Sequence, residues 1–275
     1  MEQNRKISMV SSDVDGTLLR SDGTISAHTV DVIHELQRRG ILFTICSGRY
    51  PEHADALLRH FGIRCPVTGN NGATQWDAET DRVLSDHFMP ADSARKAFEV
   101  AEGLGLSFIV FCRKYVAARH GAAPHSSQKI YGPILARDYH IVFDSGLDAV
   151  LHALDRPVNK FYFHYDTPEE RRSLTEALRV IPGISITTSG ASNVEIIPLG
   201  CDKGSGVSEM ARLYGVDMSQ VMAIGDYEND VPMLRAAGLG VAMGNAHADV
   251  RDEAACVTDT NDRDGVAKAI EKYVL

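Results

Sequence analysis

Short apolar runs alternate with amphipathic helical patterns at both ends of this chain, and this alternation restricts the fold more than any other feature. Ile7–Val10 predicts a buried strand, and Ser26 is placed to cap a helix that follows it. Ile41–Cys46 predicts a second strand, Pro51 the first residue of a second helix, and Pro66–Thr68 a third strand. Strands that alternate with helices form parallel sheets with helices on their faces. The sequence therefore predicts an α/β fold with a Rossmann-like, doubly wound parallel sheet.

The middle of the chain has a different pattern. The alternation of short strands and helices returns over residues 190–275, whereas residues 86–189 show longer and more aromatic strand patterns. This middle segment carries 12 acidic and 12 basic residues, so the net charge of −9 lies entirely in the flanking segments. We therefore expect residues 1–85 and 190–275 to form one catalytic core, with residues 86–189 inserted into it as a separate α/β cap domain.

Composition excludes several classes of protein. A chain of 275 residues with a net charge of −9 is a poor general binder of nucleic acid. No apolar run reaches the roughly 18 residues that a membrane-spanning helix needs. The polar N-terminus shows no secretory signal, and five scattered cysteines fit reduced thiols better than disulfides or a zinc site. We expect a cytoplasmic protein with no nucleic acid and no membrane as partners, and no obligate protein partner is evident.

Two carboxylates follow the first apolar run. Asp13 and Asp15 stand where the strand ends, and ligands of open α/β sheets bind beyond the carboxyl ends of the strands. Two carboxylates so close together repel each other unless a cation lies between them, and Asp oxygens suit Mg²⁺. An Asp can also attack phosphorus as a covalent nucleophile. For these two residues alone, a solvated Asp-rich turn is the simpler alternative.

Three further groups of polar residues stand at strand-to-helix junctions. Ser47–Gly48 offers a hydroxyl and an amide at a helix start, which can bind phosphate, although an ordinary N-cap serine is the alternative. Lys203 opens a helix, where a cation opposes the helix dipole, so neutralising a phosphate explains it better than local stability does, although a lone lysine would be a solvated surface residue. Asp226 follows another strand and would complete a metal site, and Asn229 and Asp230 lie one turn further on. For this motif alone, a capped helix with acids in its first turn is the simpler alternative.

These four patterns, in this order, resemble the motifs of the haloacid dehalogenase superfamily of phosphohydrolases. The first motif, D-x-D-G-T-[LV], matches Asp13–Leu18 at every position, and the other three fall at Ser47, Lys203 and Asp226. The resemblance covers both flanking segments. By position, length and alternation, the inserted segment resembles the type IIB cap of the Cof-like subfamily.

The resemblance implies a phosphatase that depends on Mg²⁺ and acts on small phosphorylated metabolites such as sugar phosphates. Asp13 would be the nucleophile, and Asp15 would serve as acid and then as base. The Mg²⁺ ion would be held by Asp13, Asp15 through its main-chain carbonyl, and Asp226. The remaining roles would be phosphate binding by Ser47, Gly48, Lys203 and Asn229, and support of Lys203 by Asp230.

Two other functions remain open at this stage. A phosphotransferase similar to phosphomannomutase shares the fold and begins with the same motif, and it would isomerise a sugar phosphate rather than release phosphate. A receiver-like module would be phosphorylated on an Asp without turnover, but the inserted segment and Lys203 argue against it.

Several basic and polar residues have no single interpretation. Arg49 could pair with a phosphate or with a neighbouring acid, and a substrate contact by Asn71 is equally open. The stretch from Phe111 to His140 contains five bases against one acid. Arg119 and Lys129 belong to this stretch, which could bind an anionic or polyhydroxyl substrate or could be a solvated basic surface.

Overall fold

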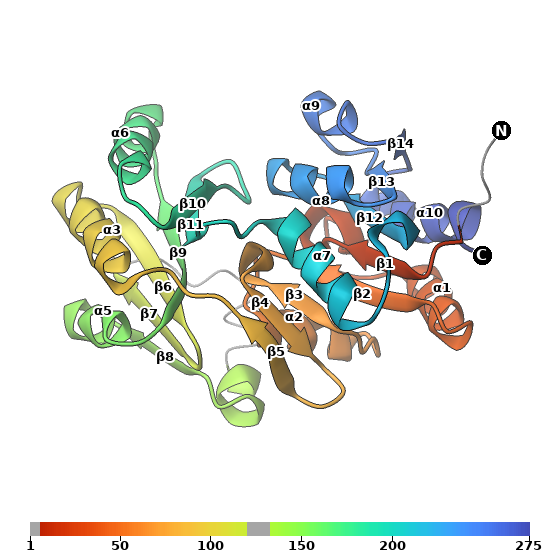
Figure 1. Ribbon diagram of the computed structural model, residues 1–275, viewed down its shortest axis with the longest axis horizontal. Helices are drawn as coiled ribbons and strands as arrows, with labels where there is room; N and C mark the ends of the chain where they lie inside the picture. The colour runs from red at the N-terminus through yellow and green to blue at the C-terminus, as the bar shows by residue number, and fades with distance from the viewer. Residues whose placement is uncertain (1–5, 120–132) are drawn as a thin grey trace. The chain divides into compact units, whose positions relative to one another are not determined.

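The computed structural model describes residues 6–119 and 133–275, and the chain divides into two compact units (Figure 1). The first unit comprises Met1–Ser85 and Asp202–Leu275, and the second comprises Asp86–Cys201. The expected second boundary at residue 190 is wrong. Strand β11 (Asn193–Pro198), which we had placed in the core, pairs with strands of the second unit instead, so the chain returns to the first unit only at Asp202.

The sheet of the first unit has strand β1 (Met9–Ser12) near its middle, between β2 (Leu42–Cys46) and β12 (Val221–Gly225). Its full order is β14 (Cys256–Val257), β13 (Leu239–Ala242), β12, β1, β2, β3 (Val67–Gly69), β4 (Thr74–Asp77) and β5 (Arg82–Asp86). Strands β14 to β3 are parallel, which confirms the predicted fold class. Strand β4 runs antiparallel to β3, and the sequence analysis did not predict this extension of the sheet.

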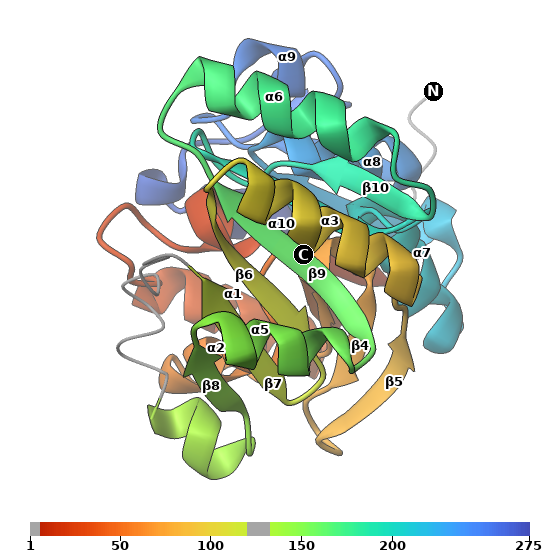
Figure 2. The same ribbon diagram turned by 90° about the vertical axis from the view of Figure 1, so that its left-hand side faces the viewer.

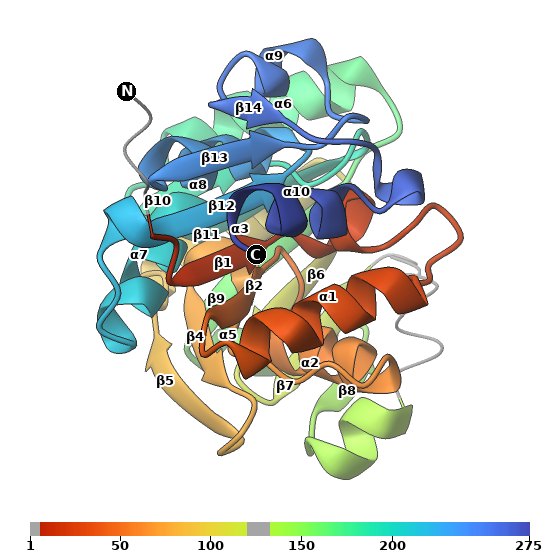
Figure 3. The ribbon, with the colours of Figure 1, turned by 90° about the vertical axis from the view of Figure 1, so that its right-hand side faces the viewer.

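Helices lie on both faces of this sheet. They are α1 (Ala27–Arg38), α2 (Pro51–His60), α7 (Lys203–Leu213), α8 (Val231–Ala236), α9 (Ala248–Arg251) and α10 (Gly265–Tyr273). Helix α1 packs beside α10, as Figure 3 shows, and α7 packs beside α8. Helical turns over Val14–Leu18, Asn70–Gly72, Met218–Gln220, Glu228–Asp230 and Asn261–Arg263 complete the unit. Within the described residues, no helix has the length and apolar character needed to cross a membrane.

Two helix starts in the first unit follow from local sequence signals. The Ser26 side chain accepts a hydrogen bond from the Thr29 amide at the N-terminus of α1, as its position predicted. Pro51 occupies the first position of α2, where its missing N–H group has no helical partner to lose. These signals determine the residue at which each helix begins.

The second unit contains a six-stranded sheet covered on one face by helices. The strand order is β10 (Ile184–Thr187), β11, β9 (Val158–His164), β6 (Ser107–Cys112), β7 (Tyr115–Arg119) and β8 (Val142–Ser145). Helices α3 (Ala91–Gly103), α5 (Leu147–Leu154) and α6 (Pro168–Arg179) lie together on one side of it (Figure 2). Phe108, Phe161 and Phe163 project into the core between the sheet and these helices. Thr167 and Glu170 form a capping box at the start of α6.

We predict that Gly72→Ala destabilises the protein more than Gly23→Ala does. Both glycines have a positive φ, +100° and +79°, so either alanine carries the strain of a left-handed backbone, about 1–2 kcal/mol. A Cβ atom on Gly72 would also lie 2.0 Å from the Asp202 carbonyl oxygen, whereas nothing lies within 4 Å of one on Gly23. Urea unfolding should show an additional loss of about 1–3 kcal/mol for Gly72→Ala. Equal losses for the two variants would contradict this close contact.

Candidate active site

The predicted polar residues meet because neighbouring parallel strands end level with one another. Ser12 at the end of β1 is in register with Ile45 of β2 and with Ile224 of β12. Asp13 therefore emerges between the residues that follow those two strands, and its amide donates a hydrogen bond to the Ile224 carbonyl oxygen at 2.9 Å. This carboxyl edge of the sheet is where α/β folds bind their ligands.

Lys203 is the cation at the centre of this edge. Its ammonium group donates to Asp13 Oδ1 at 2.7 Å and to Asp230 Oδ1 at 2.5 Å, and its side chain is 1% exposed. Burial alone would lower the pKa of Lys203, but the charges of Asp13 and Asp230 outweigh burial and raise that pKa above its ordinary value. Lys203 therefore stays protonated between the two carboxylates.

Asp230 links Lys203 to the loop that carries Asp226. Its second carboxylate oxygen accepts hydrogen bonds from the Asp226 and Tyr227 amides, each at 2.9 Å. A Cβ atom on Gly225 would lie 2.5 Å from Asp230 Cβ, so glycine is required there for this close approach. Asp230 therefore orients both the ammonium group of Lys203 and the loop that carries Asp226.

Three carboxylates gather at this edge and suit a hard metal ion. Oxygen atoms of Asp13, Asp226 and Asp230 all lie within 4.8 Å of one another. Burial raises the pKa of Asp13 well above its ordinary value, and burial with the charge of Asp230 raises that of Asp226 to about 6. If all three were ionised, Lys203 would neutralise only one of their charges. A donor set of carboxylate oxygens with excess negative charge fits a hard divalent cation.

Asp15 does not join this cluster with its carboxylate. Arg49 Nε and Nη2 donate to the two oxygens of Asp15 at 2.7 and 2.5 Å, and the Asp15 side chain is 56% exposed. Desolvation by the surrounding protein would raise the pKa of Asp15, but these hydrogen bonds hold it below its usual range. Of the two partners left open for Arg49, the structure shows the acid. A metal contact through the Asp15 main-chain carbonyl stays a prediction.

The Ser47–Gly48 turn lies against two asparagines. The Ser47 carbonyl accepts a hydrogen bond from the Asn71 amide at 3.0 Å, and Ser47 Oγ accepts one from the Arg49 amide at 3.1 Å. Asn229 Nδ2 donates to Asn71 Oδ1 at 3.0 Å. Asn71 adopts a left-handed conformation, with φ of 52°, which asparagine tolerates better than most residues. The Asn70-Asn71-Gly72 sequence was the available signal for this turn.

Two bases of the basic stretch in the second unit already have local partners. Arg119 binds both oxygens of Glu102, and Lys114 donates to the Tyr139 carbonyl. Lys129 lies outside the described residues. The interpretation of the stretch as a substrate-binding surface stays a prediction.

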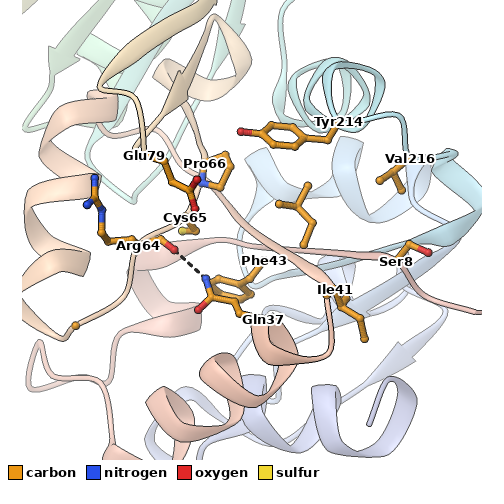
Figure 4. A pocket seen from close by; sticks show the side chains of 13 residues that line it. Ser8, Gln37, Ile41, Phe43, Arg64, Cys65, Pro66, Glu79, Tyr214 and Val216 are labelled. Atoms are coloured by element: carbon orange, nitrogen blue, oxygen red, sulfur yellow. Dashed lines mark hydrogen bonds between the residues drawn. The ribbon is translucent and has the colours of Figure 1, made fainter.

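A groove of about 750 Å³ opens at the other end of the same strands (Figure 4). Ser8, Ile41 and Pro66, which precede β1, β2 and β3, help to form it, together with Tyr214 and Val216. None of the predicted site residues is among the 13 described residues that line this groove. It is therefore distinct from the site at the carboxyl edge.

Comparison with known proteins identifies the family. A family model for haloacid dehalogenase-like hydrolases matches residues 10–270. A curated Bacillus subtilis protein, 5-amino-6-(5-phospho-D-ribitylamino)uracil phosphatase YcsE, is 28% identical over 269 residues, covering 98% of this chain and 96% of the relative. The HMP-PP phosphatase of Serratia proteamaculans is 30% identical over 239 residues, covering 85% and 82%.

Solved structures with a similar fold support the same family. A haloacid dehalogenase-like hydrolase from Bacteroides thetaiotaomicron has a TM-score of 0.80 at 28% identity, covering 97% of this chain and 99% of the other. The subclass IIB sugar phosphatase BT4131 also has a TM-score of 0.80, at 25% identity, covering 97% and 98%. This chain therefore belongs to the haloacid dehalogenase-like hydrolases. Within that family it is a Cof-like phosphatase, as its motifs indicated, which excludes the non-catalytic receiver module.

We predict that Mg²⁺ raises the thermal unfolding midpoint of the wild type and that Asp226→Asn removes most of this effect. A ligand at 100 times its dissociation constant stabilises the folded state by about 2.7 kcal/mol. Without Mg²⁺ the variant should be at least as stable as the wild type, because it relieves repulsion with Asp230. Asp31→Asn, at an exposed position of α1, is the matched control. An undiminished Mg²⁺ effect in Asp226→Asn would exclude Asp226 as a ligand.

Proposed function

We propose that this protein is a Mg²⁺-dependent phosphomonoesterase that works through an aspartyl phosphate on Asp13. The observation that carries the proposal is the contact of Asp13 with the buried ammonium group of Lys203 at 2.7 Å, inside a cluster of three carboxylates. A carboxylate can attack a phosphate dianion only where positive charge offsets their repulsion. Lys203 supplies one such charge at the nucleophile itself.

The reaction has two steps, and both use residues of this edge. Asp13 attacks phosphorus while Asp15 gives its proton to the departing alkoxide oxygen, which leaves as an alcohol. Asp15 then takes a proton from water, whose oxygen attacks the aspartyl phosphate, and inorganic phosphate and free Asp13 are formed. Asp13, Asp226 and the Asp15 main-chain carbonyl would hold Mg²⁺. When bound, the ion would neutralise charge on the carboxylates and the phosphoryl oxygens.

The turn beside the nucleophile is suited to hold the phosphate oxygens. Ser47 offers a hydroxyl and Gly48 an amide at the start of a helical segment, and Asn229 lies beside them through Asn71. Asp230 would hold Lys203 in place, since it accepts the second hydrogen bond of the ammonium group. Each of these residues binds or orients, and none needs to exchange a proton.

The activities of the relatives support the proposed substrate class. The relatives are named as phosphatases of 5-amino-6-(5-phospho-D-ribitylamino)uracil, of HMP-PP and of sugars. We infer that this protein acts on small phosphorylated metabolites, with sugar phosphates as the first class to test. A panel of such esters, assayed for released phosphate and for isomerised sugar phosphate, separates a hydrolase from a mutase.

Asp13→Asn should abolish phosphate release, because it removes the nucleophile while keeping the size of the side chain. The readout is hydrolysis of an aryl phosphate with Mg²⁺, at matched folded concentration. Asp22→Asn, in the exposed loop that follows the first motif, should retain wild-type activity. Residual turnover of Asp13→Asn above a few per cent, in a preparation free of wild type, would mean that another residue attacks phosphorus.

Lys203→Ala should reduce kcat/KM on the order of 10²–10³-fold, as removal of a preorganised positive group at a transition state typically does. Lys268→Ala removes an exposed lysine that pairs with Asp259 and is the control. Circular dichroism and the unfolding midpoint establish that both variants are folded. An unchanged kcat/KM for a folded Lys203→Ala would assign Lys203 a purely structural role.

A further inference from the structure

The side chains of Asp15 and Arg49 form an ion pair at the carboxyl edge that is held by two hydrogen bonds. Two guanidinium nitrogens each donate to one carboxylate oxygen, at 2.7 and 2.5 Å. Paired hydrogen bonds of this kind fix both groups in orientation and are stronger than single ones. Asp15 is therefore held toward Arg49, although the proposed chemistry needs its carboxyl group at the leaving oxygen.

The Asp15 side chain is not packed into the core. Asp15 is extended, with φ of −80° and ψ of 120°, and it interrupts the helical turn Val14–Leu18 just before Gly16, whose φ is +78°. Its side chain is 56% exposed, so no packed core holds it in its present place. The ion pair with Arg49 sets the direction of the Asp15 side chain.

Arg49, by contrast, is anchored. Its side chain is 15% exposed, and its Nη1 lies 3.2 Å from Nε2 of His53, which is itself buried. Its amide donates to Ser47 Oγ, so the guanidinium extends from the turn that is proposed to bind phosphate. A phosphate presents pairs of oxygens to an arginine as a carboxylate does, and it carries more negative charge.

We propose that Arg49 exchanges partners, holding Asp15 while the site is free of substrate and binding the substrate phosphate when it arrives. The exchange releases the Asp15 carboxylate from the ion pair, and the freed carboxylate takes up from solvent the proton that it then gives to the leaving oxygen. Substrate binding and the release of Asp15 are therefore one event. Asp15 and phosphate then compete for one guanidinium group. This inference rests on the proposed phosphatase function, since it takes the substrate to be a phosphate ester at this edge.

Competition has a measurable consequence. If Asp15 must be displaced from Arg49, removing the Asp15 charge should tighten phosphate binding, and it should do so only while Arg49 is present. A simple loss of one negative charge would instead tighten binding to the same extent with or without Arg49. The four proteins of a double-mutant cycle separate these cases.

The experiment measures the dissociation constant of inorganic phosphate by calorimetry, with Mg²⁺ present, for wild type, Asp15→Asn, Arg49→Met and the double variant. We expect Asp15→Asn to bind phosphate roughly tenfold or more tightly than wild type, as loss of a charge-assisted competitor predicts. In the Arg49→Met background, Asp15→Asn should change binding by less than about threefold, the residual effect expected of one partly exposed charge. Equal changes in both backgrounds, or no change in either, would overturn the exchange.

Two further variants keep the test decisive. Arg49→Gln removes the charge but keeps a side chain that can form hydrogen bonds, and the same cycle built on it should give the same result. Arg39→Met removes an exposed arginine that pairs with Glu35 on α1, and it should leave phosphate binding and turnover unchanged. In turnover assays, Arg49→Met should raise KM for an aryl phosphate by a larger factor than it lowers kcat. A fall in kcat at constant KM would contradict phosphate binding by Arg49.

Failure of this inference is distinguishable from failure of the proposed function. Phosphate binding needs no turnover, so an Arg49-dependent effect of Asp15→Asn without hydrolysis of any ester would support the exchange and reject the phosphatase. Hydrolysis without that effect would support the phosphatase and reject the exchange.

Discussion

The site is organised around an ammonium group buried between two carboxylates. Lys203 comes from the start of α7, Asp13 from the end of β1 and Asp230 from the turn before α8, and Lys203 is 190 positions from Asp13 in the chain. A charge buried without partners costs several kcal/mol, so Lys203 can be buried only where both carboxylates arrive together. The parallel sheet brings them there because β1 and β12 are neighbours and end level with one another.

Close backbone approach makes this arrangement possible. Asp230 reaches the Asp226 amide because Gly225 has no Cβ atom in its way, and Gly16 allows Asp226 to lie beside the first motif. Thr17 donates to Asp226 at 2.7 Å and so holds one of its oxygens. The loops after β1 and β12 therefore determine each other's conformation. Carboxylates placed in this way would need little reorganisation when a substrate binds.

The carboxyl edge of the sheet has two parts that differ in their balance of charge. Asp13, Asp226 and Asp230 share one ammonium group, and burial raises the pKa values of Asp13 and Asp226, so this part favours a divalent cation. Asp15 and Arg49 form a balanced and partly exposed pair beside it. The first part can hold its geometry while the second rearranges. This division suits a reaction in which the nucleophile stays still and the acid must move.

The sequence by itself determined which residues could meet, because the carboxyl ends of parallel strands share one edge of the sheet. The residues that stand at such an end, or at a helix start beside it, are Asp13, Ser47, Lys203 and Asp226. Helix starts such as Ser26 were equally predictable, since a cap acts within one turn. Tertiary structure alone decided that Arg49 pairs with Asp15, that Asn71 meets Asn229, and that strand Asn193–Pro198 belongs to the second unit. These depend on partners far away in the chain, and an apolar strand or a lone arginine carries no local signal of which distant partner it will contact.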